Sequence, residues 1–177
     1  MTSNRTVFDR QRVTRFGVLA LAVTSALVVG ACSGDDSPTS SSSTNPVLTS
    51  AVLSVNGQVV NGMTVPQGHG QGSSTRFEAT MTDMQGRPAT GMSMQVQYQR
   101  PQGMGMMNPN GTMMLYDDGT HGDPMPNDGT YCYEDWTGDY GCHTQDSPMG
   151  QYHYEFWGMD AAGHQSNHMA VDVTVGS

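Results

Sequence analysis

The segment Gln151-Tyr152-His153-Tyr154-Glu155-Phe156-Trp157 decides the fold class of this 177-residue chain. Its three even-numbered residues are aromatic, and the residues that alternate with them are polar at all but the last position. Successive side chains of a β-strand point to opposite faces, so this pattern is typical of a strand with one buried and one solvated face. The segment therefore predicts a strand whose tyrosines and phenylalanine face a core.

Six further segments have a similar period of two. The clearest are 76–82, 94–99 and 169–175, and weaker ones are 52–60, 112–116 and 130–134. Asn-Gly or Asp-Gly pairs, which tolerate the left-handed backbone of tight turns, lie between several of these segments. After residue 46, no segment has an apolar period of 3.6 that is long enough to predict a helix.

About seven short strands in about 130 residues, each with one polar face, predict an all-β domain over residues 47–177. We expect an immunoglobulin-like antiparallel β-sandwich, because two sheets packed face to face bury one face of every strand. A small up-and-down barrel is the alternative, since it buries the same alternating faces.

The first part of the chain resembles an export signal. Four arginines lie in the first fifteen residues, and a mostly apolar run extends from residue 18 to residue 29. This run is shorter than the about 20 apolar residues of a membrane span and suits a secretory signal. The segment Val29-Gly30-Ala31-Cys32 resembles a bacterial lipobox. The resemblance implies that residues 1–31 are a lipoprotein signal peptide and that Cys32 becomes the diacylglycerol-bearing N-terminus of the mature chain.

Residues 32–46 are rich in serine and contain no apolar side chain that would join a core. We expect them to form a disordered tether between the lipid and the domain. In Gram-negative sorting signals, aspartate directly after the lipidated cysteine retains a lipoprotein in the inner membrane. Ser33 occupies that position here, so the resemblance implies the outer membrane, with the domain either periplasmic or surface-exposed.

The charge of the chain excludes one class of partner. Seven basic and sixteen acidic residues give a net charge of −9, and removal of residues 1–31 would take away four of the basic residues. A polyanion repels phosphate backbones, so nucleic-acid binding is excluded as a working hypothesis.

The chain has three cysteines, an odd number for an exported protein. Lipidation would use Cys32 and leave Cys132 and Cys142 as a pair. An oxidising compartment favours bonding between such a pair, so we expect a Cys132–Cys142 disulfide.

An acidic segment lies between two of the predicted strands. Within twelve residues it contains four aspartates, Asp117, Asp118, Asp123 and Asp128. Calcium prefers six to eight hard oxygen ligands on a flexible loop, which makes these residues candidate calcium ligands. The alternative is that the aspartates form Asx turns and accept hydrogen bonds from their own backbone. The sequence leaves both interpretations open.

The acidic segment also resembles the Asp-Asp-Gly-x-x-Gly-Asp-x(4)-Asp-Gly-x-Tyr signature of bacterial immunoglobulin-like sandwich domains. The matching residues are Asp117, Asp118, Gly119, Gly122, Asp123, Asp128, Gly129 and Tyr131. Such domains often end with Gly-x-Tyr and Ala-x-Asp-x-x-Gly-Asn-x-Ser, which resemble the segments at 150–152 and 158–166. Gly158 and His164 depart from the second pattern. The resemblance implies a non-catalytic extracytoplasmic domain and carries no ligand with it.

A glycine-rich segment contains Met104, Met106 and Met107. Thioethers are soft ligands that suit Cu(I), so these methionines, joined by any of the six histidines, are candidate copper ligands. Core packing and a flexible contact loop are the alternatives for the fifteen methionines of the chain.

These observations predict a lipid-anchored, non-catalytic module that binds or scaffolds an envelope or extracellular protein or glycan. Copper handling is the alternative function. A hydrolase is the third and least favoured hypothesis, because the chain contains no Gly-x-Ser-x-Gly, His-Glu-x-x-His or phosphate-binding glycine motif.

The lipobox gives the first testable prediction. Cys32→Ser removes the acylated sulfur, so the variant should accumulate as an unprocessed precursor and incorporate no lipid. Metabolic labelling with a fatty-acid analogue measures this directly. Label that persists in the Cys32→Ser chain would contradict the assignment.

Overall fold

A computed structural model describes residues 45–102 and 109–177 of the chain. In this part the chain forms nine strands and no helix, so no helix that would cross a membrane is found there. The strands are β1 (Val47–Val55), β2 (Gln58–Val59), β3 (Thr64–Pro66), β4 (Thr75–Thr82), β5 (Ser93–Gln99), β6 (Asn110–Leu115), β7 (Thr130–Asp135), β8 (Gly150–Met159) and β9 (Met169–Gly176).

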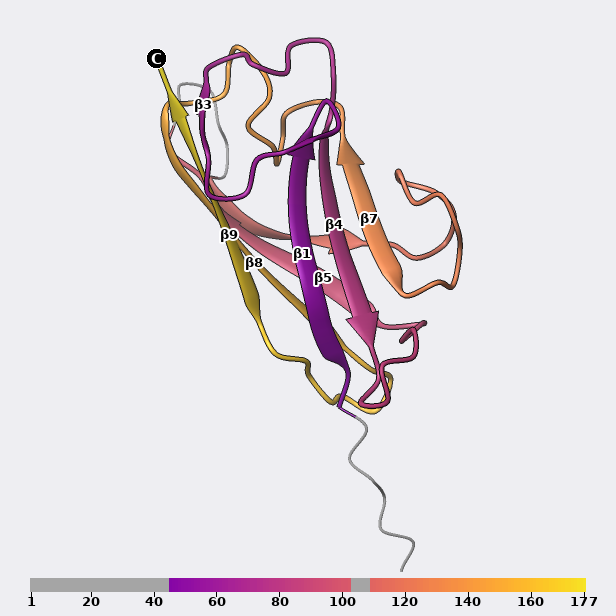
Figure 1. Ribbon diagram of the computed structural model, residues 1–177. Coiled ribbons are helices and arrows are strands. Elements are labelled where there is room, and N and C mark those ends of the chain that lie inside the picture. The colour runs from indigo at the N-terminus through magenta and orange to yellow at the C-terminus, as the bar shows by residue number, and fades with distance from the viewer. Residues whose placement is uncertain (1–44, 103–108) are drawn as a thin grey trace, which may run out of the picture. The chain divides into compact units, whose positions relative to one another are not determined.

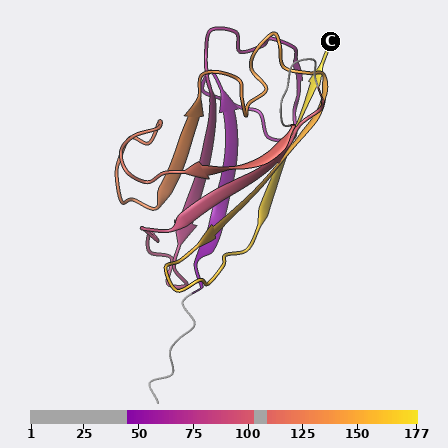
Figure 2. The same cartoon turned by 180° about the vertical axis from the view of Figure 1, so that it is seen from behind.

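The strands form two sheets that pack face to face (Figures 1 and 2). One sheet has the order β2-β1-β4-β7, and the other has the order β3-β9-β8-β5-β6. All pairs are antiparallel except β3 with β9. The predicted all-β sandwich is therefore confirmed, with nine strands in the described residues where about seven were expected, and the barrel alternative is wrong.

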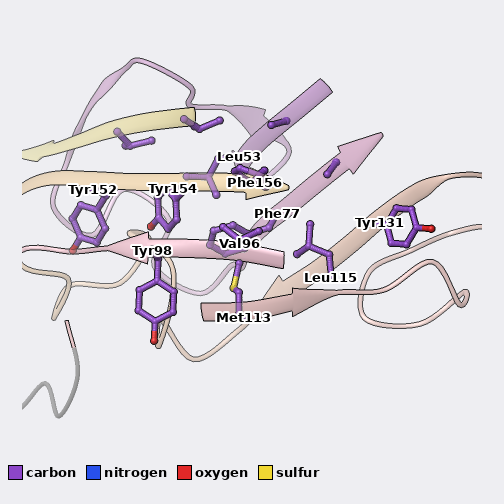
Figure 3. Packing of buried hydrophobic residues seen from close by; sticks show 14 of the residues in the cluster. Leu53, Phe77, Val96, Tyr98, Met113, Leu115, Tyr131, Tyr152, Tyr154 and Phe156 are labelled. Carbon is purple, nitrogen blue, oxygen red and sulfur yellow. The ribbon is translucent and has the colours of Figure 1, made fainter. Parts of the chain in front are cut away.

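Alternate residues of the central strands fill the space between the sheets (Figure 3). Phe77 of β4 and Tyr154 of β8 are fully buried, and their rings meet edge to face with centroids 5.2 Å apart. Because the two rings come from opposite sheets, this contact joins the layers directly. Edge-to-face aromatic pairs add about 0.5–1.5 kcal/mol beyond the burial of their surface.

The period-two faces of the sequence match the buried faces of the strands. Phe77, Met81, Val96 and Phe156 are inaccessible to solvent, as the alternation predicts. Met113 is buried, whereas the adjacent Met114 is 37% exposed on the other face of β6.

Two short strands differ from the prediction. Residues 52–60 do not form one strand, because Asn56 and Gly57 have φ angles of 51° and 73° and turn the chain back from β1 into β2. These left-handed angles are typical of a tight hairpin turn. β3 has no counterpart among the predicted segments, because three residues are too few to display a period.

Two tyrosines of β8 also hold the loop over residues 136–149, which we call the distal loop. The Tyr154 hydroxyl donates a hydrogen bond to the Tyr140 carbonyl oxygen at 2.9 Å, and the Tyr152 hydroxyl donates to that of Pro148 at 2.9 Å. The core and the distal loop are therefore built from the same side chains.

Tyr154→Phe tests this coupling. The substitution preserves the ring contact with Phe77 but leaves the Tyr140 carbonyl without its donor, so the free energy of unfolding should fall by about 1–3 kcal/mol. Chemical denaturation measures the loss. Tyr116→Phe, at a position 37% exposed, is the matched control and should change stability by less than about 0.5 kcal/mol. Equal stability of wild type and Tyr154→Phe would contradict the coupling.

Candidate functional site

The acidic segment forms a loop that connects β6 to β7 and lies beside β7 (Figure 1). Three of its four aspartates converge: one carboxylate oxygen each of Asp117, Asp123 and Asp128 lies within 4.8 Å of the others. Asp123 is only 5% exposed. The loop thus brings three carboxylates to one place.

Backbone N–H groups of the same loop stabilise these carboxylates. Asp117 accepts hydrogen bonds from the backbone N–H groups of Asp128 and Gly129, both at 3.1 Å. Asp123 accepts from Gly119 at 2.8 Å and from Met125 at 3.1 Å. The turn interpretation of the aspartates is therefore confirmed.

Asp118 does not join this group. Its carboxylate is exposed and accepts hydrogen bonds from the backbone N–H of Thr120 at 2.8 Å and from the Thr120 hydroxyl at 2.6 Å. These bonds, the hydroxyl bond first among them, hold the pKa of Asp118 below its ordinary value. Of the four predicted calcium ligands, the structure brings together Asp117, Asp123 and Asp128 and does not bring Asp118 to them.

Gly129 and Tyr131 of the acidic signature have structural roles. A Cβ at Gly129 would lie 2.8 Å from the Met81 carbonyl oxygen, and its φ of 82° favours glycine. The buried Tyr131 hydroxyl donates to the Ala89 carbonyl oxygen at 2.9 Å and accepts from the Met92 backbone N–H at 3.0 Å. This end of the signature therefore joins β7 to β4 and to the segment before β5.

The two cysteines of the domain are free in the structure, so the expected Cys132–Cys142 disulfide is not present. Cys132 lies on the outer face of β7, where Arg76 Nη2 is 3.2 Å from its sulfur. Cys142 belongs to the core cluster between the sheets. The pair fails to bond because β7 directs the Cys132 side chain away from the core that contains Cys142.

The distal loop carries functional candidates that sequence reasoning missed. Trp136 is 63% exposed, although it directly follows Asp135, which is 2% exposed. The ring of His143 is buried beneath the loop, with Nδ1 2.7 Å from the Thr75 hydroxyl oxygen. Burial lowers the pKa of His143, which favours the neutral imidazole. A tryptophan in a glycine-rich, acidic segment is the sequence signal that points to this loop, although its exposure is seen only in the structure.

Two sets of predicted residues lie outside the described part of the chain. They are Cys32, with the signal and most of the tether, and the candidate copper ligands Met104, Met106 and Met107. Their assignments stay predictions.

Comparison with known proteins adds no family. No protein-family model matches the chain, and no curated protein matches its sequence.

The convergence of three carboxylates predicts weak calcium binding. If calcium binds only the folded chain, it stabilises by RT ln(1 + [Ca]/Kd), about 2.7 kcal/mol at a hundredfold excess over Kd. The melting temperature should therefore rise by several degrees in millimolar calcium, and a chelator should return it to its value without calcium. Asp123→Asn should reduce the shift, and the matched control Asp118→Asn should preserve it. A melting curve that calcium leaves unchanged would limit the aspartates to forming turns.

Burial predicts that the thiols are inert in the folded protein. It raises the pKa of Cys132 to about 11 and that of Cys142 to about 12, so few thiolates exist at pH 7.5. In the Cys32→Ser chain, maleimide should label neither Cys132 nor Cys142 in the folded protein and should label both after unfolding in denaturant. Mass spectrometry counts the maleimide adducts on each chain. A Cys132–Cys142 cross-link in a non-reduced digest would contradict free thiols and support the disulfide that the sequence predicts.

Proposed function

We propose that this protein is a lipid-anchored, non-catalytic binding module of the cell envelope that presents one end of its β-sandwich to a partner. The lipobox at Cys32 and the Ser-rich residues 32–46 support the anchor, and the outer membrane is the proposed location. The partner is an envelope or extracellular protein or glycan.

The placement of the loops carries this proposal. The chain enters β1 at one end of the sandwich, and the distal loop, the loop over residues 67–74 and the end of β9 lie at the opposite end (Figure 1). If the anchor precedes β1, these loops form the part of the domain that is farthest along the sandwich from the membrane. A partner outside the membrane would meet this end first.

The use of the carboxylates supports a non-catalytic role. Asp117, Asp123 and Asp135 each accept hydrogen bonds from backbone N–H groups of their own loops. A carboxylate engaged in this way organises a loop and has fewer lone pairs left for proton transfer. The net charge of −9 further favours neutral or cationic partners over polyanions.

Copper handling stays the alternative function. Its candidate ligands Met104, Met106 and Met107 lie outside the described residues, so no described contact favours it. Their triple replacement with leucine, followed by Cu(I) competition with a chelator, would test it.

Site-directed photo-crosslinking in cells tests the proposed function. Gln58 pairs with Val55, the last residue of β1, and so lies at the end of β1 away from the anchor. Met84, which is 63% exposed, follows β4, whose last residue Thr82 pairs with Val47 at the start of β1. A photoreactive phenylalanine analogue at Gln58 should form protein or glycan adducts, and the same analogue at Met84 should form far fewer. The Cys32→Ser chain should lose the Gln58 adducts. Equal adducts at both positions, or adducts at Met84 alone, would contradict the proposed orientation.

A further inference from the structure

A pocket of about 370 Å³ lies between the distal loop and the loop over residues 67–74. We call it the Trp136 pocket. Beside the Trp136 side chain, its lining includes the polar residues Gln71, Ser73, Thr144, Gln145 and Asp146. The pocket combines one large aromatic surface with amide, hydroxyl and carboxylate groups.

The exposure of Trp136 needs a physical reason. Tryptophan is highly buried on average, yet this side chain is 63% exposed. Exposed tryptophans that are held in place are frequent anchors of binding sites, because they bury a large surface on contact at a small entropic cost. A ligand-binding role for Trp136 therefore requires a loop that is held in place.

The Asp135 carboxylate fixes the first half of the distal loop. It accepts hydrogen bonds from the backbone N–H groups of Thr137, Gly138, Tyr140 and Gly141 at 2.7–3.0 Å, and from the Thr137 hydroxyl at 2.8 Å. Charge-assisted bonds of this kind are roughly twice as strong as neutral ones. Five of them hold the turn that begins at Trp136.

Close packing further restrains the loop. A Cβ at Gly138 would lie 2.5 Å from Thr144 Cγ2, and a Cβ at Gly141 would collide with the Thr75 side chain. The hydroxyls of Tyr152 and Tyr154 hold two loop carbonyls from below. The pocket is therefore preorganised, which reduces the entropy lost when a ligand binds.

The amide groups opposite Trp136 are also oriented. Gln145 Nε2 donates a hydrogen bond to Gln71 Oε1 at 2.7 Å. The other polar atom of each amide, Gln71 Nε2 and Gln145 Oε1, makes no hydrogen bond within the described part of the chain. The pocket thus offers one oriented donor and one oriented acceptor.

We propose that the Trp136 pocket binds a neutral carbohydrate, with a sugar ring stacked on the Trp136 indole and its hydroxyls on the Gln71 and Gln145 amides. The C–H face of a pyranose is apolar and flat, whereas its rim carries hydroxyls that both donate and accept hydrogen bonds. Asp146 and the negative net charge disfavour anionic sugars. This inference rests on the proposed function and names the class of its partner.

A quaternary ammonium or lysine side chain is the competing ligand class, because a cation is attracted to an indole face and to Asp146. Cation sites usually enclose the charge in a cage of several large aromatic rings, whereas this pocket has the Trp136 indole and, beside it, only the buried imidazole of His143. The oriented amides favour a hydroxylated ligand instead.

Tryptophan fluorescence of the full-length chain in detergent tests the proposal. The chain has two tryptophans, and the second, Trp157, lies on the outer face of β8, where it stacks on His168 with ring centroids 5.3 Å apart. Trp157→Phe leaves Trp136 as the reporter and is the matched control. The probes are neutral oligosaccharides of glucose, mannose, galactose and N-acetylglucosamine, with choline as the cationic probe.

We expect at least one oligosaccharide to change the Trp136 emission in the Trp157→Phe chain. Trp136→Ala should weaken binding, measured by calorimetry, by at least about thirtyfold, as for a binding hot spot. Gln71→Ala and Gln145→Ala, which change exposed side chains, should each weaken it by about five- to tenfold. These two variants keep the test decisive if Trp136→Ala fails to fold.

Three results would overturn the proposal. They are no binding of any oligosaccharide to the wild-type chain, binding that Trp136→Ala, Gln71→Ala and Gln145→Ala leave unchanged, and binding of choline alone that Asp146→Asn abolishes. The crosslinking at Gln58 is measured separately in cells. A chain that forms distal adducts but binds no sugar would therefore refute the carbohydrate and preserve the proposed function.

Discussion

The contact between Phe77 and Tyr154 is the interaction on which the other parts of the domain depend. It joins the two sheets at their centre, and the hydroxyl of the same tyrosine reaches out of the core to the distal loop. The hydroxyl of a buried tyrosine needs a hydrogen-bond partner, and here the Tyr140 carbonyl oxygen of the distal loop is that partner. Tyr154 therefore takes part both in core packing and in holding the distal loop.

The domain uses aspartates as organisers of its loops. Asp117 gathers the end of the acidic loop, and Asp135 gathers the start of the distal loop, each by accepting several backbone N–H groups. Burial, the largest single influence, would raise the pKa of Asp135, but the hydrogen bonds from Tyr140, Gly141 and Thr137 together lower it. Glycine-rich loops lose much conformational entropy on folding. The hydrogen bonds to these carboxylates offset the free-energy cost of that loss.

The sequence predicted the sheets better than the sites. Alternation over five or more residues identified the buried faces of β4, β5, β8 and β9, because a strand with one buried face places an apolar residue at every second position. It missed β3, whose parallel pairing with β9 joins residues more than a hundred positions apart. The alternation of β7 did contain the signal against the disulfide, since Cys132 directly follows the core residue Tyr131. The Trp136 pocket was beyond prediction, because Gln71 and Gln145 meet only in the folded domain.

The acidic loop also affects how one copy of the domain meets another. β7 is an edge strand, and the loop lies against it, with Gly122 close enough that an added Cβ would lie 3.1 Å from the Glu134 side chain. Uncovered edge strands promote pairing between molecules, and negative charge beside an edge opposes it. Where many copies share a surface, this loop therefore disfavours strand exchange and aggregation through β7. The same aspartates that shape the loop thereby protect the β7 edge of the sandwich against self-assembly.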